Sequence, residues 1–284
     1  MKTRILTALV GLLVLTGVLI GFYTPFVVEA AVALLAMLSV YELLKETKLV
    51  SSVWMFLPAM LLAGWIPFSF RFENRAATLV PPAVLVVYLL LLMLARHEQI
   101  TFMQVACTIF AAVVLPLCYS SLLIFRDLGQ PHGIFYTLIA LGGAWFSDIG
   151  GYFIGRKFGR HKLAPKVSPK KSVEGVFGGV VFVVLGTALI GFLYGLIYNR
   201  WFAGNAPIQV HYGFLIAIGL LLTPVGILGD LCASVIKRQT QIKDFGIIMP
   251  GHGGILDRFD SALWTMTAVA IFLLLGGRLL FPGV

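Results

Sequence analysis

The stretch ATLVPPAVLVVYLLLLMLA, Ala77–Ala95, contains 19 residues and no charged side chain. An α-helix rises about 1.5 Å per residue, so a helix of this length crosses about 30 Å of hydrocarbon. Its backbone groups would all be paired within the segment, as a lipid environment requires. The stretch therefore predicts a transmembrane helix.

Comparable apolar runs recur along the whole chain, which is 60% hydrophobic and 12% charged and has a mean hydropathy of +0.98. A soluble domain would carry about twice that charge. A β-barrel would show short alternating segments instead of long apolar runs. We expect an all-α, polytopic integral membrane protein of about nine transmembrane helices, near 5–22, 25–43, 49–69, 77–95, 102–125, 133–154, 174–198, 210–232 and 259–281.

The loops between these runs are short, so residues 1–284 are expected to form a single integral domain. The helices of residues 1–130 carry few polar signals. The first run follows Lys2 and Arg4, a pattern also typical of a signal peptide. Because it is long enough to span, and another apolar run follows almost at once, we favour a retained helix.

Positive charge is distributed unevenly between the two sides that nine spans define. Of the 21 Lys and Arg residues, 16 lie at the N-terminus or in the loops after even-numbered spans, and five lie on the other side. The positive-inside rule then places the N-terminus and those loops in the cytoplasm. The net charge of +9 is read as a topology signal and as attraction to anionic headgroups or phosphates, and no nucleic-acid partner is expected.

Some polar or reactive residues carry no functional pattern. Cys107, Cys118 and Cys232 lie in apolar stretches without a C-x-x-C pair, so neither a disulfide nor a zinc site is expected. Glu29, Glu42 and Glu46 form no constellation, and we expect packing or interface roles for them.

Two aspartates, Asp148 and Asp230, lie inside apolar helices, where a charge costs about 2.5–3.5 kcal/mol on insertion scales. Such a group needs a partner, a cation or an aqueous cavity. Helical spacing places Ser234, Lys237 and Arg238 on the same face as Asp230.

Asp257, Asp260 and Ser261 share a face at the start of the last span. Carboxylates so arranged suit a hard cation such as magnesium. The alternative is that Asp257 and Asp260 only cap their helix.

Two cytoplasmic segments hold the remaining candidates. In PGHGG, Pro250–Gly254, three glycines surround His252 and would let backbone N–H groups approach a phosphate, although an ordinary tight turn is an alternative. The basic segment Arg156–Lys171 could bind phosphates, or it could serve topology and anionic lipid. In SPKKS, Ser168–Ser172, Lys170 and Lys171 lead into a helix N-terminus that can bind an anion.

The stretch SVIKRQTQIKDFGIIMPGHGGILDRFD, Ser234–Asp260, closely resembles the C-terminal signature of phosphatidate cytidylyltransferases, also called CDP-diacylglycerol synthases. RKFGRHKLAPKVSPKKSVEG, Arg156–Gly175, resembles a second motif of that family. The resemblance is strong over residues 145–261, which would hold the catalytic helices and loops, and is only topological before them.

The resemblance implies a nucleotidyltransferase that converts CTP and phosphatidic acid to CDP-diacylglycerol and pyrophosphate during phospholipid biosynthesis. It implies magnesium as cofactor, with room for a second cation, and membrane lipids as surroundings. The site would face the cytoplasm at a bacterial inner (plasma) membrane, and a homodimer is compatible with it.

The resemblance also implies roles for individual residues. The metal ligands would be Asp230 and Asp257, followed by Asp260 and Asp148. The other catalytic groups would be Lys237, Arg238, Lys243, Asp244 and Arg258, and the substrate-binding groups Lys170, Lys171, Ser172, Ser234, Gly251, His252, Gly253 and Gly254. Which lysines bind CTP and which bind the lipid phosphate stays open, as does the role of His252.

Two rival functions remain. One is another membrane transferase that uses a nucleotide-linked lipid or sugar, although the CDP-alcohol phosphotransferase pattern is absent. The other is an ion-coupled transporter with Asp148 and Asp230 in its path. A transporter predicts two related halves, whereas the sequence shows no repeat and its polar residues gather on one side of the membrane.

Overall fold

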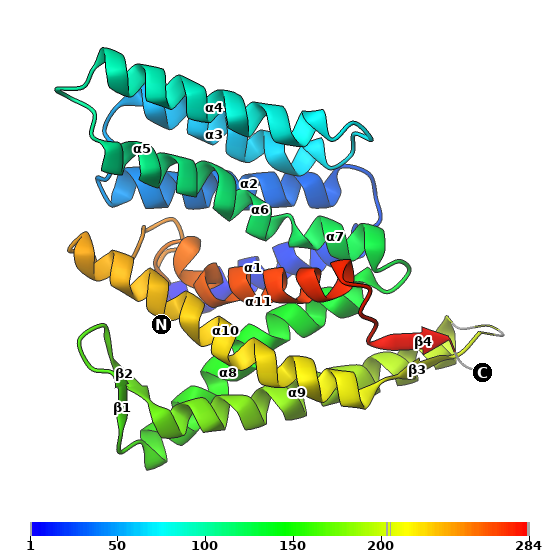
Figure 1. Ribbon diagram of the computed structural model, residues 1–284. Coiled ribbons are helices and arrows are strands. Elements are labelled where there is room, and N and C mark those ends of the chain that lie inside the picture. Colours follow the sequence, from blue (N-terminus) through cyan, green and yellow to red (C-terminus); the bar gives the residue numbers. More distant parts are fainter. Residues whose placement is uncertain (1, 203, 205, 283–284) are drawn as a thin grey trace. The chain divides into compact units, whose positions relative to one another are not determined.

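A computed structural model describes residues 2–202, 204 and 206–282, and most of them are helical (Figure 1). The α-helices are α1 (Lys2–Ile20), α2 (Val27–Tyr41), α3 (Val53–Ser69), α4 (Ala76–Ala95), α5 (Phe102–Ile109), α6 (Leu115–Tyr119), α7 (Ser121–Leu128), α8 (Gly133–Phe158), α9 (Val173–Trp201), α10 (Tyr212–Gln239) and α11 (Leu256–Leu274). Two π-helical turns, η1 (Glu42–Glu46) and η2 (Phe110–Val114), follow α2 and α5.

Each of the nine expected spans overlaps a helix or a series of helical segments, but the last one, 259–281, is helical only as far as Leu274 and ends in a strand, Leu280–Pro282. Within the described residues, six stretches are long and apolar enough to cross a membrane: Val27–Glu46, Ala76–Ala95, Phe102–Leu128, Gly133–Phe158, Val173–Trp201 and Tyr212–Gln239. Ile5–Ile20 and Val53–Ser69 are apolar but shorter. The expectation of a polytopic helical membrane protein is confirmed, while the number nine stays a prediction.

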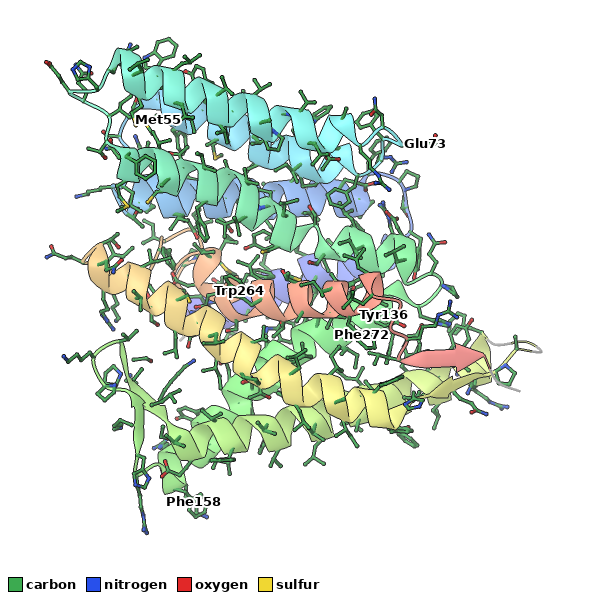
Figure 2. All side chains as sticks on the ribbon, viewed as in Figure 1. Met55, Glu73, Tyr136, Phe158, Trp264 and Phe272 are labelled. Carbon is green, nitrogen blue, oxygen red and sulfur yellow. The ribbon has the colours of Figure 1, made fainter. Side chains whose placement is uncertain are left out.

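Large apolar side chains cover the outside of these helices, as expected of a protein whose solvent is lipid. On α4, Leu79 is 68% exposed and Leu94 is 72% exposed. Two residues labelled in Figure 2 illustrate the contrast: Met55 of α3 is buried, whereas Phe158 at the end of α8 is exposed.

Four short strands interrupt the helical pattern and were not expected from the sequence. Strand β1 (Lys162–Ala164) pairs antiparallel with β2 (Ser168–Ser172), and β3 (Ile208–Val210) pairs antiparallel with β4 (Leu280–Pro282). In β2 the residue before Pro169 is sterically held in the extended region, which favours a strand. Lys170 and Lys171 therefore lie in a β-hairpin that leads directly into α9.

The described chain forms two compact units. Unit 1 comprises Met1–Leu123 and Ile236–Phe259, and unit 2 comprises Ile124–Val235 and Asp260–Val284. Within unit 1, the hydroxyls of Ser39 and Tyr119 lie 2.8 Å apart in the buried core. This hydrogen bond joins α2 to α6.

The carboxylate of Glu29 on α2 is fully buried in unit 1 and accepts a hydrogen bond of 2.8 Å from Arg71. The Arg71 guanidinium also lies over the Phe26 ring, 4.4 Å from its centroid. A buried carboxylate needs such a partner. This contact agrees with the packing role expected of Glu29.

In unit 2, glycines let α8 and α9 pack closely. A Cβ atom on Gly150 would lie 2.5 Å from the carbonyl oxygen of Gly178, and a Cβ on Gly186 would meet the Phe146 ring. Small residues at a helix interface bring two backbones together in membranes. This approach places Asp148 of α8 near the start of α9, within one pocket.

Candidate functional site

The residues predicted to form the site are divided between the two units. Unit 1 contains Lys237, Arg238, Lys243, Asp244, Gly251, His252, Gly253, Gly254, Asp257 and Arg258, whereas unit 2 contains Asp148, Lys170, Lys171, Ser172, Asp230, Ser234 and Asp260. Each unit has its own pocket lined by several of these residues.

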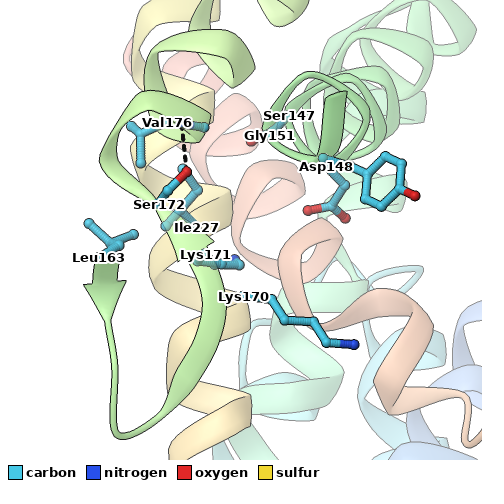
Figure 3. A pocket seen from close by; sticks show the side chains of 11 residues that line it. Ser147, Asp148, Gly151, Leu163, Lys170, Lys171, Ser172, Val176 and Ile227 are labelled. Carbon is cyan, nitrogen blue, oxygen red and sulfur yellow. Dashed lines mark hydrogen bonds between the residues drawn. The ribbon is translucent and has the colours of Figure 1, made fainter. Parts of the chain in front are cut away.

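The pocket of unit 2, called here the hairpin pocket, has a volume of about 190 Å³ (Figure 3). It is lined by Ser147, Asp148, Gly151 and Tyr152 of α8, by Leu163 of β1, by Lys170, Lys171 and Ser172 of β2, by Gly175 and Val176 of α9, and by Ile227 of α10. Two ammonium groups therefore share a pocket with one carboxylate and several apolar side chains.

Lys171 also forms an ion pair with Asp230 of α10, and both side chains are about one quarter exposed. This pair supplies the partner that an aspartate inside an apolar helix requires. It joins the SPKKS segment to α10.

Ser172 holds the junction between β2 and α9. It is the N-cap of α9, and its hydroxyl oxygen accepts a hydrogen bond of 3.1 Å from the N–H of Gly175. Behind it, Glu174 accepts hydrogen bonds from the backbone N–H groups of Arg160 and His161, and its carboxylate lies 2.7 Å from His161 Nδ1. The hairpin is thus fastened to the first turn of α9.

The pocket of unit 1, called here the glycine-loop pocket, has a volume of about 760 Å³. It is lined by Lys243, Asp244, Gly246, Ile247, Met249, Pro250, Gly251, His252, Gly253 and Arg258. Most of its lining is charged side chain or glycine-rich backbone, which suits a highly charged, water-soluble group.

The PGHGG segment folds as a tight turn. His252 N donates to Met249 O at 2.8 Å, and Met249 N donates to Gly253 O at 2.9 Å. Gly251 and Gly253 have φ values of 79° and 88°, which L side chains rarely adopt. The turn expected as an alternative is therefore present, and its backbone borders the pocket.

Arg258 and His252 are joined through the backbone of this turn. Arg258 Nε and Nη2 both donate to the carbonyl oxygen of His252, at 3.0 and 2.6 Å. The Nδ1 atom of His252 is buried and makes no hydrogen bond with any residue that the structure describes. A buried polar atom of this kind indicates a missing partner.

Asp257 accepts several hydrogen bonds in unit 1, and its side chain is only 4% exposed. Its Oδ1 accepts a hydrogen bond of 2.8 Å from Lys237 Nζ. Its Oδ2 accepts from the N–H groups of Phe245, at 2.7 Å, and Gly254, at 3.0 Å. The ammonium of Lys237 also lies 5.1 Å from the centroid of the Phe245 ring.

These bonds answer the question whether Asp257 only caps α11. The Oδ2 atom of Asp257 accepts from backbone N–H groups of the loop that precedes the helix. The N–H groups at the start of the helix are bound by another carboxylate, that of Glu42 in η1. Glu42 Oε1 accepts from Ile255 N and Oε2 from Leu256 N, both at 2.8 Å.

The sequence offered little reason to select Glu42, which we expected to be a packing or interface residue. The only local signal is an acidic residue at the end of an apolar run. Its partners lie 213 and 214 residues away, beyond any helical or strand spacing.

The remaining predicted residues have fewer described contacts. Arg238, Lys243 and Asp244 are exposed, and Ser234 is half-buried on α10 one turn after Asp230. Asp260 Oδ1 accepts from Ser261 N at 2.7 Å.

The carboxylates provide oxygen donors of the kind that magnesium prefers. Within residues 2–202, 204 and 206–282, no group of three His, Cys, Asp or Glu side chains is placed to hold a metal ion. Asp230 and Asp257 are instead each paired with a lysine ammonium. The donor chemistry fits a hard cation whose charge would take the place of these ammonium groups.

Comparison with known proteins extends the family resemblance of residues 145–261 to nearly the whole chain. A sequence model described as "Cytidylyltransferase family" matches residues 2–275. A protein of Bacillus subtilis (strain 168), named phosphatidate cytidylyltransferase, is 35% identical over 279 residues, which cover 94% of this chain and 95% of that protein.

Two further relatives carry the same name. The protein of Staphylococcus haemolyticus (strain JCSC1435) is 30% identical over 276 residues, which cover 96% of this chain and 99% of its own length. The protein of Haemophilus influenzae is 44% identical over 131 residues, which cover 46% of this chain and 42% of its own length.

Proposed function

The chain belongs to the cytidylyltransferase family, and from that premise we propose that it transfers the cytidylyl group of CTP to phosphatidic acid. The products would be CDP-diacylglycerol and pyrophosphate. One observation carries the assignment within this chain: the motif residues Lys237 and Gly254 both donate hydrogen bonds to Asp257, beside a polar pocket of phosphate-binding character.

The chemistry requires little covalent participation from the protein. A phosphate oxygen of phosphatidic acid attacks the α-phosphorus of CTP, the bond from that phosphorus to the β-phosphate oxygen breaks, and pyrophosphate leaves with the electron pair. A phosphate monoester is already ionised near neutral pH, so no strong general base is needed. Positioning and neutralisation of charge supply most of the catalysis in such transfers.

We assign the triphosphate of CTP to the glycine-loop pocket. The glycine backbone permits close approach of N–H groups, and the exposed Lys243 and Arg258 border the same space. The buried Nδ1 atom of His252 makes this side chain a candidate phosphate donor.

We assign the lipid phosphate to the hairpin pocket. Lys170 and Lys171 offer two cationic groups, and the neighbouring Leu163, Val176 and Ile227 provide apolar walls for the glycerol and the start of the acyl chains. Ser172 sets the N-terminus of α9 beside these lysines, and a helix N-terminus favours an anion.

We further propose that magnesium is the cofactor and that the ligands come from Asp230, Asp257, Asp260 and Asp148. When bound, the cation would neutralise charge on the phosphate oxygens. Lys171 and Lys237, which hold two of these carboxylates in the structure, would then be released to contact phosphates.

The proposed setting is a bacterial plasma membrane, with nine spans, the N-terminus inside and the site at the cytoplasmic face. The distribution of Lys and Arg supports this orientation. A single-cysteine series in a chain without Cys107, Cys118 and Cys232 tests it. A cysteine at Lys166 should react with an impermeant maleimide only in inverted vesicles, and labelling of intact cells would reject the orientation.

The function itself is tested with purified protein, CTP, phosphatidic acid and magnesium. Formation of CDP-diacylglycerol and pyrophosphate in equal amounts is the expected result. If neither product forms over a range of lipids and detergents, the proposed function is wrong. Transport of an ion without CTP would instead favour the transporter alternative.

A further inference from the structure

Glu42 lies far from the motifs in sequence, yet its fully buried carboxylate lies beside both ends of the loop Phe245–Leu256. Its two oxygens accept the N–H groups of Ile255 and Leu256, at 2.8 Å each. These are N–H groups at the start of α11, which have no partner within the helix. A negative charge at this position is also favoured by the helix dipole.

Two glycines of the loop leave room for this carboxylate. A Cβ atom on Gly246 would lie 2.9 Å from Glu42 Oε1, and a Cβ on Gly254 would lie 2.5 Å from Oε2. Real Cβ atoms essentially never come so close to another atom, so any larger residue at either place would force a shift. The loop backbone therefore closes around the Glu42 side chain from two sides.

Asp257 fastens the same two segments. Its Oδ2 accepts from Phe245, next to Gly246, and from Gly254, next to Ile255. Two carboxylates thus hold one loop at neighbouring points, one from inside the motif and one from η1. If Glu42 were absent, Asp257 would be the one carboxylate of the two left to hold these segments, while also pairing with Lys237.

We propose that Glu42 is a positioning residue of the cytidylyl transfer. Its carboxylate fixes the loop Phe245–Leu256, and with it the bonds that orient Asp257 and the carbonyl that Arg258 contacts. Glu42 begins a π-helical turn, a feature often found at functional sites. The inference rests on the proposed function for its kinetic readout, but its structural readout is independent of activity.

The test compares Glu42→Gln with Glu46→Gln in purified, detergent-solubilised protein. Glutamine keeps one acceptor oxygen but turns an amide N–H₂ toward a backbone N–H, so one of the two bonds is lost. Glu46 lies in the same π-helical turn and is exposed, which makes it a matched control. We expect Glu42→Gln to raise the KM for CTP about tenfold or more, with the KM for phosphatidic acid within about twofold of the parent.

Hydrogen–deuterium exchange supplies the second readout. Amides of residues 245–256 should exchange about tenfold faster in Glu42→Gln, whereas amides in the middle of α8 and α9 should keep their protection. Glu46→Gln should match the parent in both measurements. If Glu42→Gln exchanges faster in this way but the parent protein makes no CDP-diacylglycerol, the loop contact is supported and the proposed function is rejected.

Gly246→Ala provides a second perturbation if Glu42→Gln does not fold. Its φ is not in the left-handed region, so alanine is tolerated by the backbone, while the added methyl group presses on the same carboxylate. We expect the same rise in the KM for CTP and the same faster exchange. The proposal is overturned if Gly246→Ala leaves both unchanged, or if Glu42→Gln folds and behaves like Glu46→Gln.

Discussion

The ammonium of Lys237 lies 2.8 Å from Oδ1 of Asp257, although 20 residues separate them in the chain. Both side chains are nearly buried, with exposures of 14% and 4%. Removing one member of a buried pair leaves the other charge uncompensated, which is costly. Loss of either residue is therefore expected to disturb the loop Phe245–Leu256, which Asp257 holds.

Asp257→Asn should reduce kcat by about 100-fold or more, the range observed when an electrostatic contribution to a transition state is removed. Asparagine keeps one oxygen for the loop amides but no longer carries the charge that balances Lys237. Product formation under saturating substrates measures the effect. Asp127→Asn is a suitable control because Asp127 pairs with the adjacent Arg126 outside both pockets. Near-normal turnover in Asp257→Asn would remove Asp257 from the metal assignment.

Lys171→Ala should raise the KM for phosphatidic acid by about tenfold and lower kcat as well, because a phosphate partner and the counter-charge of Asp230 are lost together. The measurement is a series of phosphatidic acid titrations in mixed micelles. Lys166→Ala, in the exposed turn of the same hairpin, should be unchanged. If both variants weaken lipid use equally, the hairpin acts through general surface charge and the pocket assignment is wrong.

Gly253→Ala should lower both stability and activity. The left-handed conformation, with φ of 88°, costs an L residue roughly 1–2 kcal/mol, and the new Cβ would lie 3.0 Å from Asp257 Oδ2. Gly276→Ala separates these two effects, since its φ is 82° and its Cβ would meet nothing within 4 Å. Thermal unfolding should therefore shift in both variants, whereas turnover should fall only in Gly253→Ala. Equal loss of turnover would show that strain alone is responsible.

Removal of magnesium with a chelator should abolish turnover and leave the unfolding temperature nearly unchanged. Lys171 and Lys237 already neutralise Asp230 and Asp257, so the fold does not depend on a cation to separate these carboxylates from like charges. Thermal unfolding with and without chelator, followed by re-addition of magnesium, gives the comparison. Turnover that survives complete chelation would reject the metal proposal.

Much of the fold could be predicted from the sequence because a membrane helix is a long apolar run, which can be identified without knowing what it packs against. The run Ala77–Ala95 became α4 with only one residue added at its start. The strands β1 and β2 were not predicted, because a hairpin of basic residues beside Pro169 shows no alternation of apolar and polar positions.

The site could be predicted only as far as its motifs extend. Ser172 was correctly placed at the start of a helix, whereas the role of Asp257 at the site stays a prediction. The capping interpretation of Asp257 did not anticipate that Glu42 takes that part. Hydrogen bonds between residues more than 200 positions apart follow from tertiary packing, and a periodic pattern in one segment carries no information about them.

The contact between Glu42 and the start of α11 also has a consequence for hybrid proteins assembled from related sequences. A junction placed anywhere between residues 46 and 243 would join an acceptor from one parent to a loop from the other. Such hybrids should be active only when the parent that contributes the N-terminal helices has, at position 42, an acceptor side chain long enough to bond the start of α11. The helices that carry no recognisable motif would then decide which exchanges give an active enzyme.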